Sequence, residues 1–309
     1  MHPWLAGSLR VERLTVPIQG LPLALAGLRL VQLSDFHFDG LRLSPLLLQQ
    51  ALAATQAAQP DLVVLTGDYI TDDPRPMGEL CRYLREIRAT YGVYAVLGNH
   101  DIAWPEARQV VTAALTQAGI QVLWNQVAYP MGRGLAVVGL ADFWSKEFRP
   151  APVFQAVPPE VPRLVLSHNP DSAEVLQRWR VDLQLSGHTH GGQVVIPGWG
   201  PLPARTRTWL QRMPGWLRRR IPSPLFNQNC DRVILHWEWS EGLHQVGANR
   251  LYVNRGLGTY LPGRLFCPPE VTVITLTTAT EPMPQAPRET PILEHSLAFR
   301  QGILSQFAG

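Results

Sequence analysis

Short apolar runs alternate with stretches of helical periodicity along most of the chain. Near-continuous Val/Leu/Ile runs are typical of strands that are buried on both faces of a sheet. Strands that alternate with helices predict an α/β (α+β) fold built on sheets. The predicted strands are Leu28–Ser34, Asp61–Thr66, Val93–Leu97, Gly134–Leu140, Arg163–Ser167 and Val181–Ser186, followed later by Arg232–Trp239, Leu251–Asn254 and Val271–Thr277.

The stretches between these strands carry helix signals. Pro45–Ala58 follows Ser44, a favoured N-cap residue, and has proline at its first position, where the missing N–H is not needed. Pro105–Ala118 is followed by Gly119, a residue type common just past a helix end. The other predicted helices are Met77–Ala89 and Asp171–Trp179. We therefore expect helices packed against a sheet.

The predicted elements belong to one domain, residues 1–280. A proline-rich linker follows at 281–291, and residues 292–309 have apolar positions that could form one face of a helical arm. The longest uncharged stretch near the start, Leu14–Leu28, is shorter than the roughly 20 apolar residues that cross a bilayer. We expect a cytoplasmic protein, with peripheral contact to the inner face of a membrane as an open alternative.

Composition narrows the class of protein further. The 309 residues include 27 basic and 24 acidic side chains, a net charge of +3 that excludes a histone-like polycation and an acidic disordered chain. Three cysteines, Cys81, Cys230 and Cys267, are odd in number and far apart, so a disulfide framework is not expected. Five of the nine histidines fall in short motifs with glycine, aspartate or asparagine. These motifs are the candidate chemistry.

Five motifs share one arrangement, in which a predicted strand ends and polar ligand-type residues follow at once. Because ligands bind at the carboxyl ends of strands in open α/β sheets, these side chains should meet in one crevice. In each of the pairs Asp35/His37 and His188/His190, we expect an extended backbone to point both side chains the same way. The motifs are Ser34–His37, Thr66–Asp68, Gly98–Asp101, Ser167–Asn169 and Ser186–Gly191.

The donor types in these motifs indicate metal binding. Two carboxylates, one amide oxygen and four imidazoles suit Mn²⁺, Fe, Zn²⁺ or Mg²⁺, and Mn²⁺ is our leading expectation. Seven ligands are too many for one tetrahedral ion and fit two ions with a shared carboxylate, an arrangement that hydrolyses phosphate esters. One such motif alone is more often a turn or a surface pair. The predicted ligands are Asp35, His37, Asp68, Asn99, His168, His188 and His190.

The ordered motifs resemble those of the calcineurin-like metallophosphoesterases from Ser34 to Gly191. The resemblance implies a four-layer αββα sandwich of two mixed sheets flanked by helices, and attack on phosphorus by a metal-bridging hydroxide. His100 would protonate the leaving oxygen, and Asp101 would orient His100. One metal would be held by Asp35, His37 and His190, the other by Asn99, His168 and His188, with Asp68 bridging the two.

A narrower resemblance, to the bacterial YkuE/YaeI-type branch, covers most of the chain. Its members are phosphodiesterases or pyrophosphatases, and some cleave the lipid A precursor UDP-2,3-diacylglucosamine, which makes a nucleotide-linked lipid the expected substrate. A nuclease or cyclic-nucleotide phosphodiesterase is the alternative enzyme, and a non-catalytic scaffold of the same fold is the alternative of another class. The matching segments are Leu33–His37, Gly187–Gln193, Tyr252–Gly258 and Arg264–Glu270.

Residues that could select the substrate follow the last motif. The segment Arg205–Arg220 combines six arginines with tryptophan and leucine, a composition typical of membrane-interface segments. A solvated basic loop is the alternative, and we expect no nucleic-acid partner, because nucleic-acid binding calls for an extended basic groove rather than one short cluster. The sequence predicts no oligomeric state. Asp39 fits an exposed turn better than a site carboxylate, and Asp142 is expected to be structural. The candidate substrate contacts are Trp209, Arg212, Trp216 and Arg255.

Overall fold

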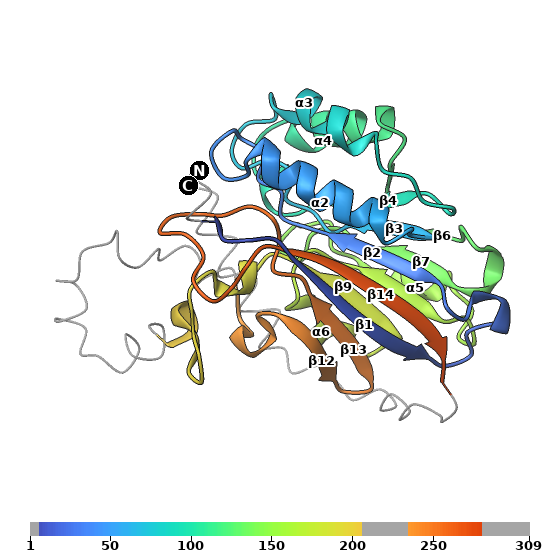
Figure 1. Cartoon of the computed structure of the whole chain (residues 1–309). Helices are drawn as coiled ribbons and strands as arrows, with labels where there is room; N and C mark the ends of the chain where they lie inside the picture. Colours follow the sequence, from blue (N-terminus) through green and yellow to red (C-terminus); the bar gives the residue numbers. More distant parts are fainter. Residues whose placement is uncertain (1–5, 206–233, 280–309) are drawn as a thin grey trace.

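The computed structural model describes residues 6–205 and 234–279. Two six-stranded mixed sheets form the centre of the molecule (Figure 1). The first sheet has the strand order β1 (Arg10–Ile18), β14 (Glu270–Thr278), β2 (Arg29–Leu33), β3 (Leu62–Leu65), β4 (Val93–Ala95), β5 (Gln121–Val122). The second has the order β12 (Gly242–Val246), β13 (Asn249–Val253), β9 (Leu183–Ser186), β8 (Arg163–Leu166), β7 (Ala136–Gly139), β6 (Gln126–Ala128).

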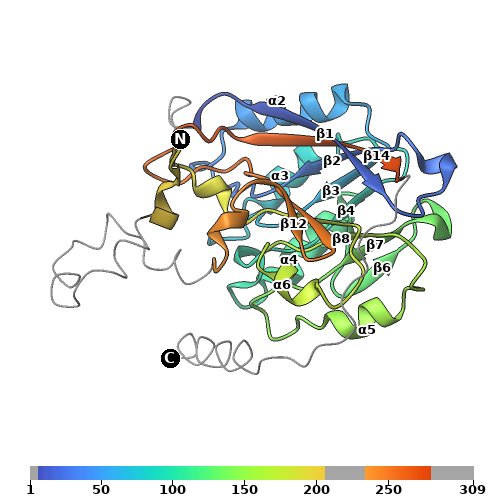
Figure 2. The same cartoon turned by 90° about the horizontal axis from the view of Figure 1, so that it is seen from below.

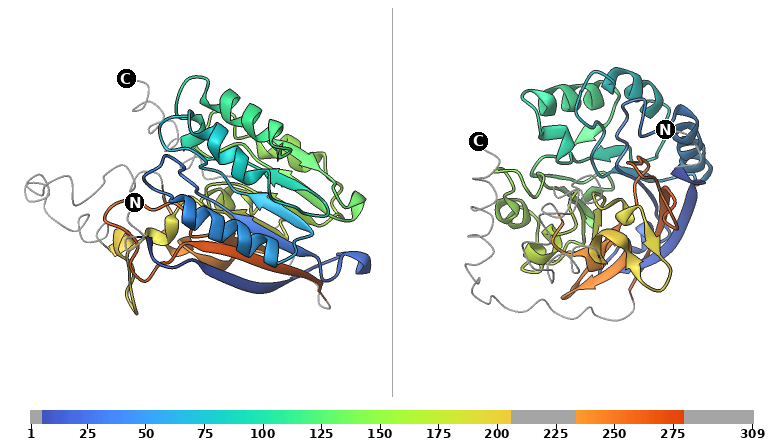
Figure 3. Two further views of the ribbon diagram at one scale, coloured as in Figure 1. Left: turned by 45° about the horizontal axis from the view of Figure 1, so that its top comes forward. Right: turned by 90° about the vertical axis from the view of Figure 1, so that its left-hand side faces the viewer.

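Helices cover the outer face of each sheet. The helices α2 (Pro45–Ala57), α3 (Met77–Leu84) and α4 (Ala107–Gln117) lie over the first sheet (Figures 1 and 3). The shorter helices α5 (Pro150–Gln155) and α6 (Ser172–Leu176) lie over the second, on the side of the molecule away from α2 (Figure 2). The predicted sandwich of two mixed sheets flanked by helices is therefore confirmed.

Three apolar clusters hold these layers together. One joins α2, α3 and α4 to the outer face of the first sheet. A second lies between the two sheets and includes Leu30, Val64, Leu164 and Leu185, all buried. The third packs α5 and α6 on the second sheet. Because β2, β3 and β8 carry apolar residues on both faces, each contributes to the middle cluster and to an outer one, as the continuous runs predicted. β9 contributes only Leu183 and Leu185 to the middle cluster, because its other face carries Gln184.

The central strands and α2 agree with the predictions to within a few residues, and two helices differ more. The helix predicted over Met77–Ala89 ends at Leu84 and continues as turns. The one predicted over Asp171–Trp179 ends at Leu176. The helix predicted over Pro105–Ala118 agrees to within two residues, at Ala107–Gln117. The structure also contains β1, β12 and the short hairpin β10 (Val195–Ile196) with β11 (Gly200–Pro201), none of which was predicted. β1 is an edge strand with exposed polar residues and Pro17, so it lacks the apolar run of a central strand.

The strand predicted at Arg232–Trp239 is wrong in its described part. Residues 237–239 form a 3₁₀ turn, η6 (Trp237–Trp239). The N–H groups of Leu235 and His236 donate to the carboxylate of Asp171, at 2.7 and 2.9 Å, so no neighbouring strand receives them. A side chain thus replaces the sheet partner that the apolar pattern implied.

The predicted boundaries at the C-terminus lie outside the described residues, so the linker at 281–291 and the helical arm at 292–309 stay predictions. Within residues 6–205 and 234–279, no helix is long and apolar enough to cross a membrane.

Candidate metal centre

The candidate ligands come from both sheets. Asp35 and His37 follow β2, Asp68 follows β3 and Asn99 follows β4, all in the first sheet. The remaining ligands, His168, His188 and His190, follow β8 and β9 in the second sheet. Within each sheet these strands are parallel, so their carboxyl ends share one edge. The two edges bring all seven residues to one place.

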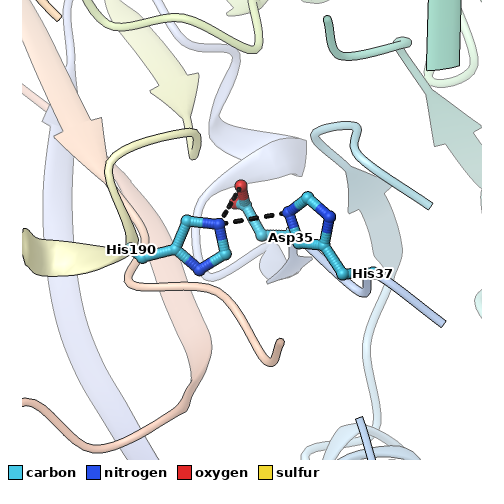
Figure 4. Close-up of side chains that lie close together, drawn as sticks. All are labelled: Asp35, His37 and His190. Carbon is cyan, nitrogen blue, oxygen red and sulfur yellow. Dashed lines mark hydrogen bonds and ion pairs between the residues drawn. The ribbon is translucent and has the colours of Figure 1, made fainter. Parts of the chain in front are cut away.

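The first ligand group joins β2 to β9. Asp35, His37 and His190 are buried and offer donor atoms that all lie within 4.8 Å of one another. His190 Nε2 lies 3.1 Å from His37 Nε2 and 3.5 Å from Asp35 Oδ1, and Figure 4 shows the three side chains turned toward one point. These are the residues predicted to hold one metal ion.

The second ligand group lies around Asp68. Asp68 Oδ2 is 3.1 Å from His168 Nε2 and 3.6 Å from His37 Nε2, so this carboxylate touches a residue of each predicted set. His188 Nδ1 is 3.2 Å from His168 Nε2. Asp68, His168 and His188 again offer donors within 4.8 Å of one another. Asp68 therefore lies between the two ligand groups.

The donor atoms fit a divalent cation. Asn99 Oδ1 is buried and accepts no hydrogen bond from the described residues, although buried amide oxygens are normally paired. His168 Nδ1 faces the carbonyl oxygen of Thr66 at 2.7 Å, so in the neutral ring Nε2 carries the lone pair, and this atom faces Asp68. Two acceptors at this spacing attract each other only through a shared cation or proton. The unpaired oxygen of Asn99 and the close acceptor atoms of His168 and Asp68 are the donor arrangement that a divalent cation requires.

Two further imidazoles of the cluster, those of His190 and His37, each have Nδ1 next to an oxygen atom of the chain. His190 Nδ1 faces the carbonyl oxygen of Gly258 at 3.2 Å, and His37 Nδ1 faces the hydroxyl of Tyr260 at 3.0 Å. Partners of this kind fix the ring orientation and the tautomer of metal-binding histidines. Sequence reasoning missed Tyr260; its place two residues after the matched segment Tyr252–Gly258 was the available signal.

The backbone at the ligands is not extended, so the expected reason for the paired side chains is wrong. Five of the seven candidate ligands have positive φ values between 43° and 72°, a region that residues other than glycine rarely adopt. A left-handed turn, repeated at the ends of β2, β3 and β9, aims the side chain into the cluster. These five residues are Asp35, His37, Asp68, His188 and His190.

Two glycines allow neighbouring segments to approach closely. A Cβ atom on Gly98 would lie 2.1 Å from Asp68 Oδ1, and one on Gly187 would lie 2.2 Å from Asp35 Oδ2. Neither distance is compatible with a side chain. The glycines of these motifs therefore make room for the two carboxylates.

Asp101 does not orient His100, contrary to the prediction. Its two carboxylate oxygens accept the N–H groups of Asp68, Tyr69, Ile70 and Gly98, at 2.8 to 3.3 Å. His100 Nδ1 instead faces the carbonyl oxygen of Thr71 at 2.7 Å. Asp101 is buried and holds two ligand-bearing loops together, a role that the motif alone did not reveal.

Burial dominates the protonation of the cluster. It raises the pKa of Asp35 to about 6 and lowers the pKa of His37 to about 3. For Asp68 and His168, burial opposes ionisation, but their mutual attraction prevails: the pKa of Asp68 falls well below its usual range and the pKa of His168 rises to about 10. Asp68 and His168 thus form an ion pair, and a bound cation would replace the proton of His168 as the partner of the Asp68 carboxylate.

Arg255 is not placed to contact a substrate phosphate. Its guanidinium faces the carboxylates of Glu12, Glu241 and Glu270 at 2.8 to 3.1 Å, and its side chain is only 11% exposed. Three carboxylates leave it no free edge, so it is a structural residue. The other candidate substrate contacts, Trp209, Arg212 and Trp216, lie outside the described residues.

Comparisons with known proteins agree with this site. Residues 28–192 match the family "Calcineurin-like phosphoesterase". The chain is 33% identical to "Phosphodiesterase YaeI" of Escherichia coli over 81% of this chain and 83% of that protein. It is 30% identical to the metallophosphoesterase YkuE of Bacillus subtilis, over 85% and 83% of the two chains. It is 27% identical to "UDP-2,3-diacylglucosamine pyrophosphatase LpxG" of Chlamydia muridarum, over 81% and 84%.

The match includes every strand that carries a candidate ligand. The resemblance drawn from the motifs, including the YkuE/YaeI-type branch, is thereby confirmed. The described residues also provide grouped ligands for the divalent ions that this fold implies. The chain belongs to the calcineurin-like phosphoesterases and is a metal-dependent phosphoric ester hydrolase.

Proposed function

We propose that the chain hydrolyses a phosphodiester or pyrophosphate bond with two divalent ions, Mn²⁺ being favoured. The observation that carries this proposal is the position of Asp68 between the two ligand groups, 3.6 Å from His37 and 3.1 Å from His168. In the proposed arrangement Asp68 is the bridging ligand. One ion is held by Asp35, His37 and His190 and the other by Asn99, His168 and His188.

The chain's own residues then position the substrate and supply a proton. The bound ions would supply electrostatic stabilisation of the phosphate and activation of water. His100 donates its backbone N–H to Asp68 Oδ1 at 2.9 Å, and its Nδ1 faces Thr71. This fixes the ring so that, in the imidazolium form, the Nδ1 proton stays in its hydrogen bond to the Thr71 carbonyl and the Nε2 proton passes to the leaving oxygen. His100 is half-buried at the cluster, as a group that meets substrate should be.

An apolar patch beside the cluster supports a lipid-bearing substrate. Leu261 is 78% exposed, Phe266 is 67% exposed and Trp199 is 56% exposed, unusual values for large apolar side chains. The two segments that carry them are joined, because Leu265 N–H donates to the carbonyl of Gln193 at 2.8 Å. Figure 1 shows both segments, in yellow and orange, at the end of the molecule where β2 points. The patch comprises Ile196, Trp199, Leu261, Leu265 and Phe266.

The proposed substrate is a nucleotide-linked lipid whose acyl chains rest on this patch. Two relatives are named for cleaving UDP-2,3-diacylglucosamine, and this chain aligns with more than four fifths of each. Such a reaction would take place at the inner face of a membrane, with the 205–220 segment as a further contact. Acyl chains of a substrate would remove the apolar patch from water.

Reconstitution with single metals tests the reaction. We expect the protein loaded with Mn²⁺ to hydrolyse bis-p-nitrophenyl phosphate and UDP-2,3-diacylglucosamine, with lower rates for Mg²⁺, Zn²⁺ or Fe. Asp68→Ala should lose bound metal, whereas His100→Ala should keep metal and lose turnover. Full metal occupancy in Asp68→Ala would contradict the bridging assignment. Preferred cleavage of a cyclic nucleotide or DNA would favour the alternative enzyme.

Substitutions in the patch test the lipid part of the proposal. We expect Leu261→Ser with Phe266→Ser to raise KM for a micellar substrate severalfold while leaving hydrolysis of a small soluble diester unchanged, because only the acyl contacts are lost. Leu23→Ser is the matched control, since Leu23 is equally exposed but precedes β2, at the opposite edge of the sheet. Equal losses on both substrates would count against acyl binding.

A further inference from the structure

Tyr260 connects the metal cluster to its surroundings. Its hydroxyl lies 3.0 Å from His37 Nδ1, and its ring meets the rings of His37 and His190 edge to face, with centroids 5.0 and 5.4 Å apart. The Tyr260 N–H donates to the side-chain oxygen of Gln193 at 2.6 Å, which fixes the backbone from which the ring projects. Tyr260 is therefore a rigid wall of the site.

Arg42 lies on that wall. Its guanidinium carbon is 4.6 Å from the centroid of the Tyr260 ring, a cation–π geometry, and Asp39 pairs with one guanidinium nitrogen. Asp39 also accepts the N–H groups of Leu41 and Arg42 at 2.8 Å and the hydroxyl of Thr71 at 3.1 Å. Thr71 is the residue whose carbonyl orients His100.

A closed ring of contacts results. It runs from His37 through Tyr260, Arg42, Asp39 and Thr71 to His100, whose imidazole meets that of His37 edge to face at 4.9 Å. Asp39 is thus part of the site rather than an exposed turn residue. The ring sets one positive charge at a fixed place beside the candidate ligands.

Arg42 differs from the other arginines that lie near the cluster. Arg264 is buried and donates to the carbonyl oxygens of Arg255, Gly256 and Gly258, while Arg255 faces three carboxylates. Arg42 has one carboxylate partner among the described residues, and its side chain is 26% exposed. It therefore keeps guanidinium N–H groups that can face a ligand.

The geometry points to Arg42 as a substrate-binding residue, which contacts a non-reacting phosphate oxygen of the substrate. A guanidinium presents paired N–H groups that match phosphate oxygens. Tyr260 and Asp39 are the positioning residues, because they hold the two sides of the guanidinium and tie it to His37 and His100. The inference rests on the proposed phosphoester hydrolysis and adds the group that recognises the phosphate.

The test compares Arg42→Gln, Arg42→Lys and Arg108→Gln in the metal-loaded protein. Arg108 is the matched control: it lies over Trp124 at 5.2 Å and pairs with Glu147 at 2.6 Å, but these partners are not part of the ring. We expect Arg42→Gln to raise KM for bis-p-nitrophenyl phosphate and the inhibition constant of inorganic phosphate by about tenfold or more, with kcat within about threefold. Arg42→Lys should recover part of the loss, and Arg108→Gln should behave as wild type.

Two further readouts separate this inference from a structural role and from the proposed function. Metal content and thermal midpoint should be unchanged in Arg42→Gln; a loss of metal, or wild-type values of both KM and the phosphate inhibition constant, would overturn the inference. If the wild type hydrolyses no phosphoester with any metal, the proposed function fails. Calorimetric titration of inorganic phosphate into metal-loaded wild type and Arg42→Gln then still decides whether Arg42 binds the anion.

Discussion

The candidate ligands occupy backbone conformations that most residues avoid. A positive φ at a residue other than glycine costs of order 1–3 kcal/mol, and five ligands share it. Such conformations persist where neighbouring contacts over-determine them, and Asp101 supplies four of these contacts around Asp68 and Gly98. The hydrogen bonds of Asp101 therefore offset part of the free-energy cost of the positive-φ backbone at Asp68.

Asp101→Asn tests this role at the residue scale. An amide offers one acceptor oxygen where the carboxylate offers two, so at least one backbone N–H loses its partner. We expect the free energy of unfolding to fall by about 2–4 kcal/mol and the metal content to fall with it. Urea unfolding and metal analysis measure both quantities, with His100→Ala as the control that keeps metal. Normal stability and metal content with lost turnover would instead support an orienting role for Asp101.

Much of the site could be predicted at the residue scale, because the type of a residue determines which ligand atoms its side chain offers to a metal ion. Asp35, His37 and His190 are recognisable as donors wherever they lie. What cannot be predicted is the conformation that aims them, since positive φ values depend on partners distant in sequence. Arg42 and Tyr260 were missed for the same reason: nothing local marks an arginine that stacks on a ring 218 positions later.

At the scale of elements, the segment 235–240 supports two of the loops that carry candidate ligands. Asp171, which precedes α6, accepts the N–H groups of Leu235 and His236, and Thr189 donates its hydroxyl to the carbonyl of Ser240 at 2.5 Å. His236 stacks on Trp239 with ring centroids 4.1 Å apart. This segment thus holds the loops that carry His168 and His188.

The stability of this segment should depend on pH through His236. Burial lowers the pKa of His236, but the facing carboxylates of Glu238, Asp171 and Glu174 outweigh it, so the pKa is raised above 6.5. A raised histidine pKa stabilises the fold fully below about pH 6.5 and loses that contribution as pH rises through the folded-state pKa. His236→Gln should therefore lower the thermal midpoint at pH 6 and have a smaller effect at pH 9.

The expected effect is below about 1 kcal/mol because the ion pairs are partly exposed. His244→Gln is the control, since His244 Nε2 faces the neutral carbonyl of Glu241 at 2.8 Å. A midpoint difference between His236→Gln and wild type that stays constant from pH 6 to pH 9 would contradict the prediction.

The strands that could be predicted from the sequence are those buried on both faces of a sheet. β3 is apolar throughout and β8 is apolar after Arg163, and both were found from their runs. β1 and β12 alternate between exposed and partly buried positions at the sheet edges, a pattern that many loops share. The 3₁₀ turn at 237–239 was missed because its partner is the Asp171 carboxylate, 64 positions earlier than Leu235.

At the scale of the whole molecule, metal binding should couple the two sheets. Asp35, His37, Asp68 and Asn99 come from the first sheet, whereas His168, His188 and His190 come from the second. An ion held by both groups stabilises the contact between the sheets in addition to the apolar layer. Ions that bind only the folded chain shift unfolding by mass action.

Removal of metal by a chelator should therefore lower the thermal midpoint of the entire domain. At a thousandfold excess over the dissociation constant, one bound ion contributes about 4 kcal/mol. Calorimetry with and without EDTA measures the change, and Asp68→Ala, which is expected to lack metal, should not respond. A wild-type midpoint that stays constant while metal analysis shows complete removal would rule out this coupling.

The placement of β14 has a consequence for how the protein is made. β1 pairs in parallel with β14, some 250 residues later in the sequence, and β14 separates β1 from β2. During synthesis β1 therefore leaves the ribosome long before β14, its partner in the sheet, and the edge of β2 that pairs with β14 stays open until β14 is made. Glu270, the first residue of β14, also pairs with Arg255 and Tyr252. A nascent chain stalled before residue 270 would thus carry every candidate metal ligand and still lack the last strand of its first sheet.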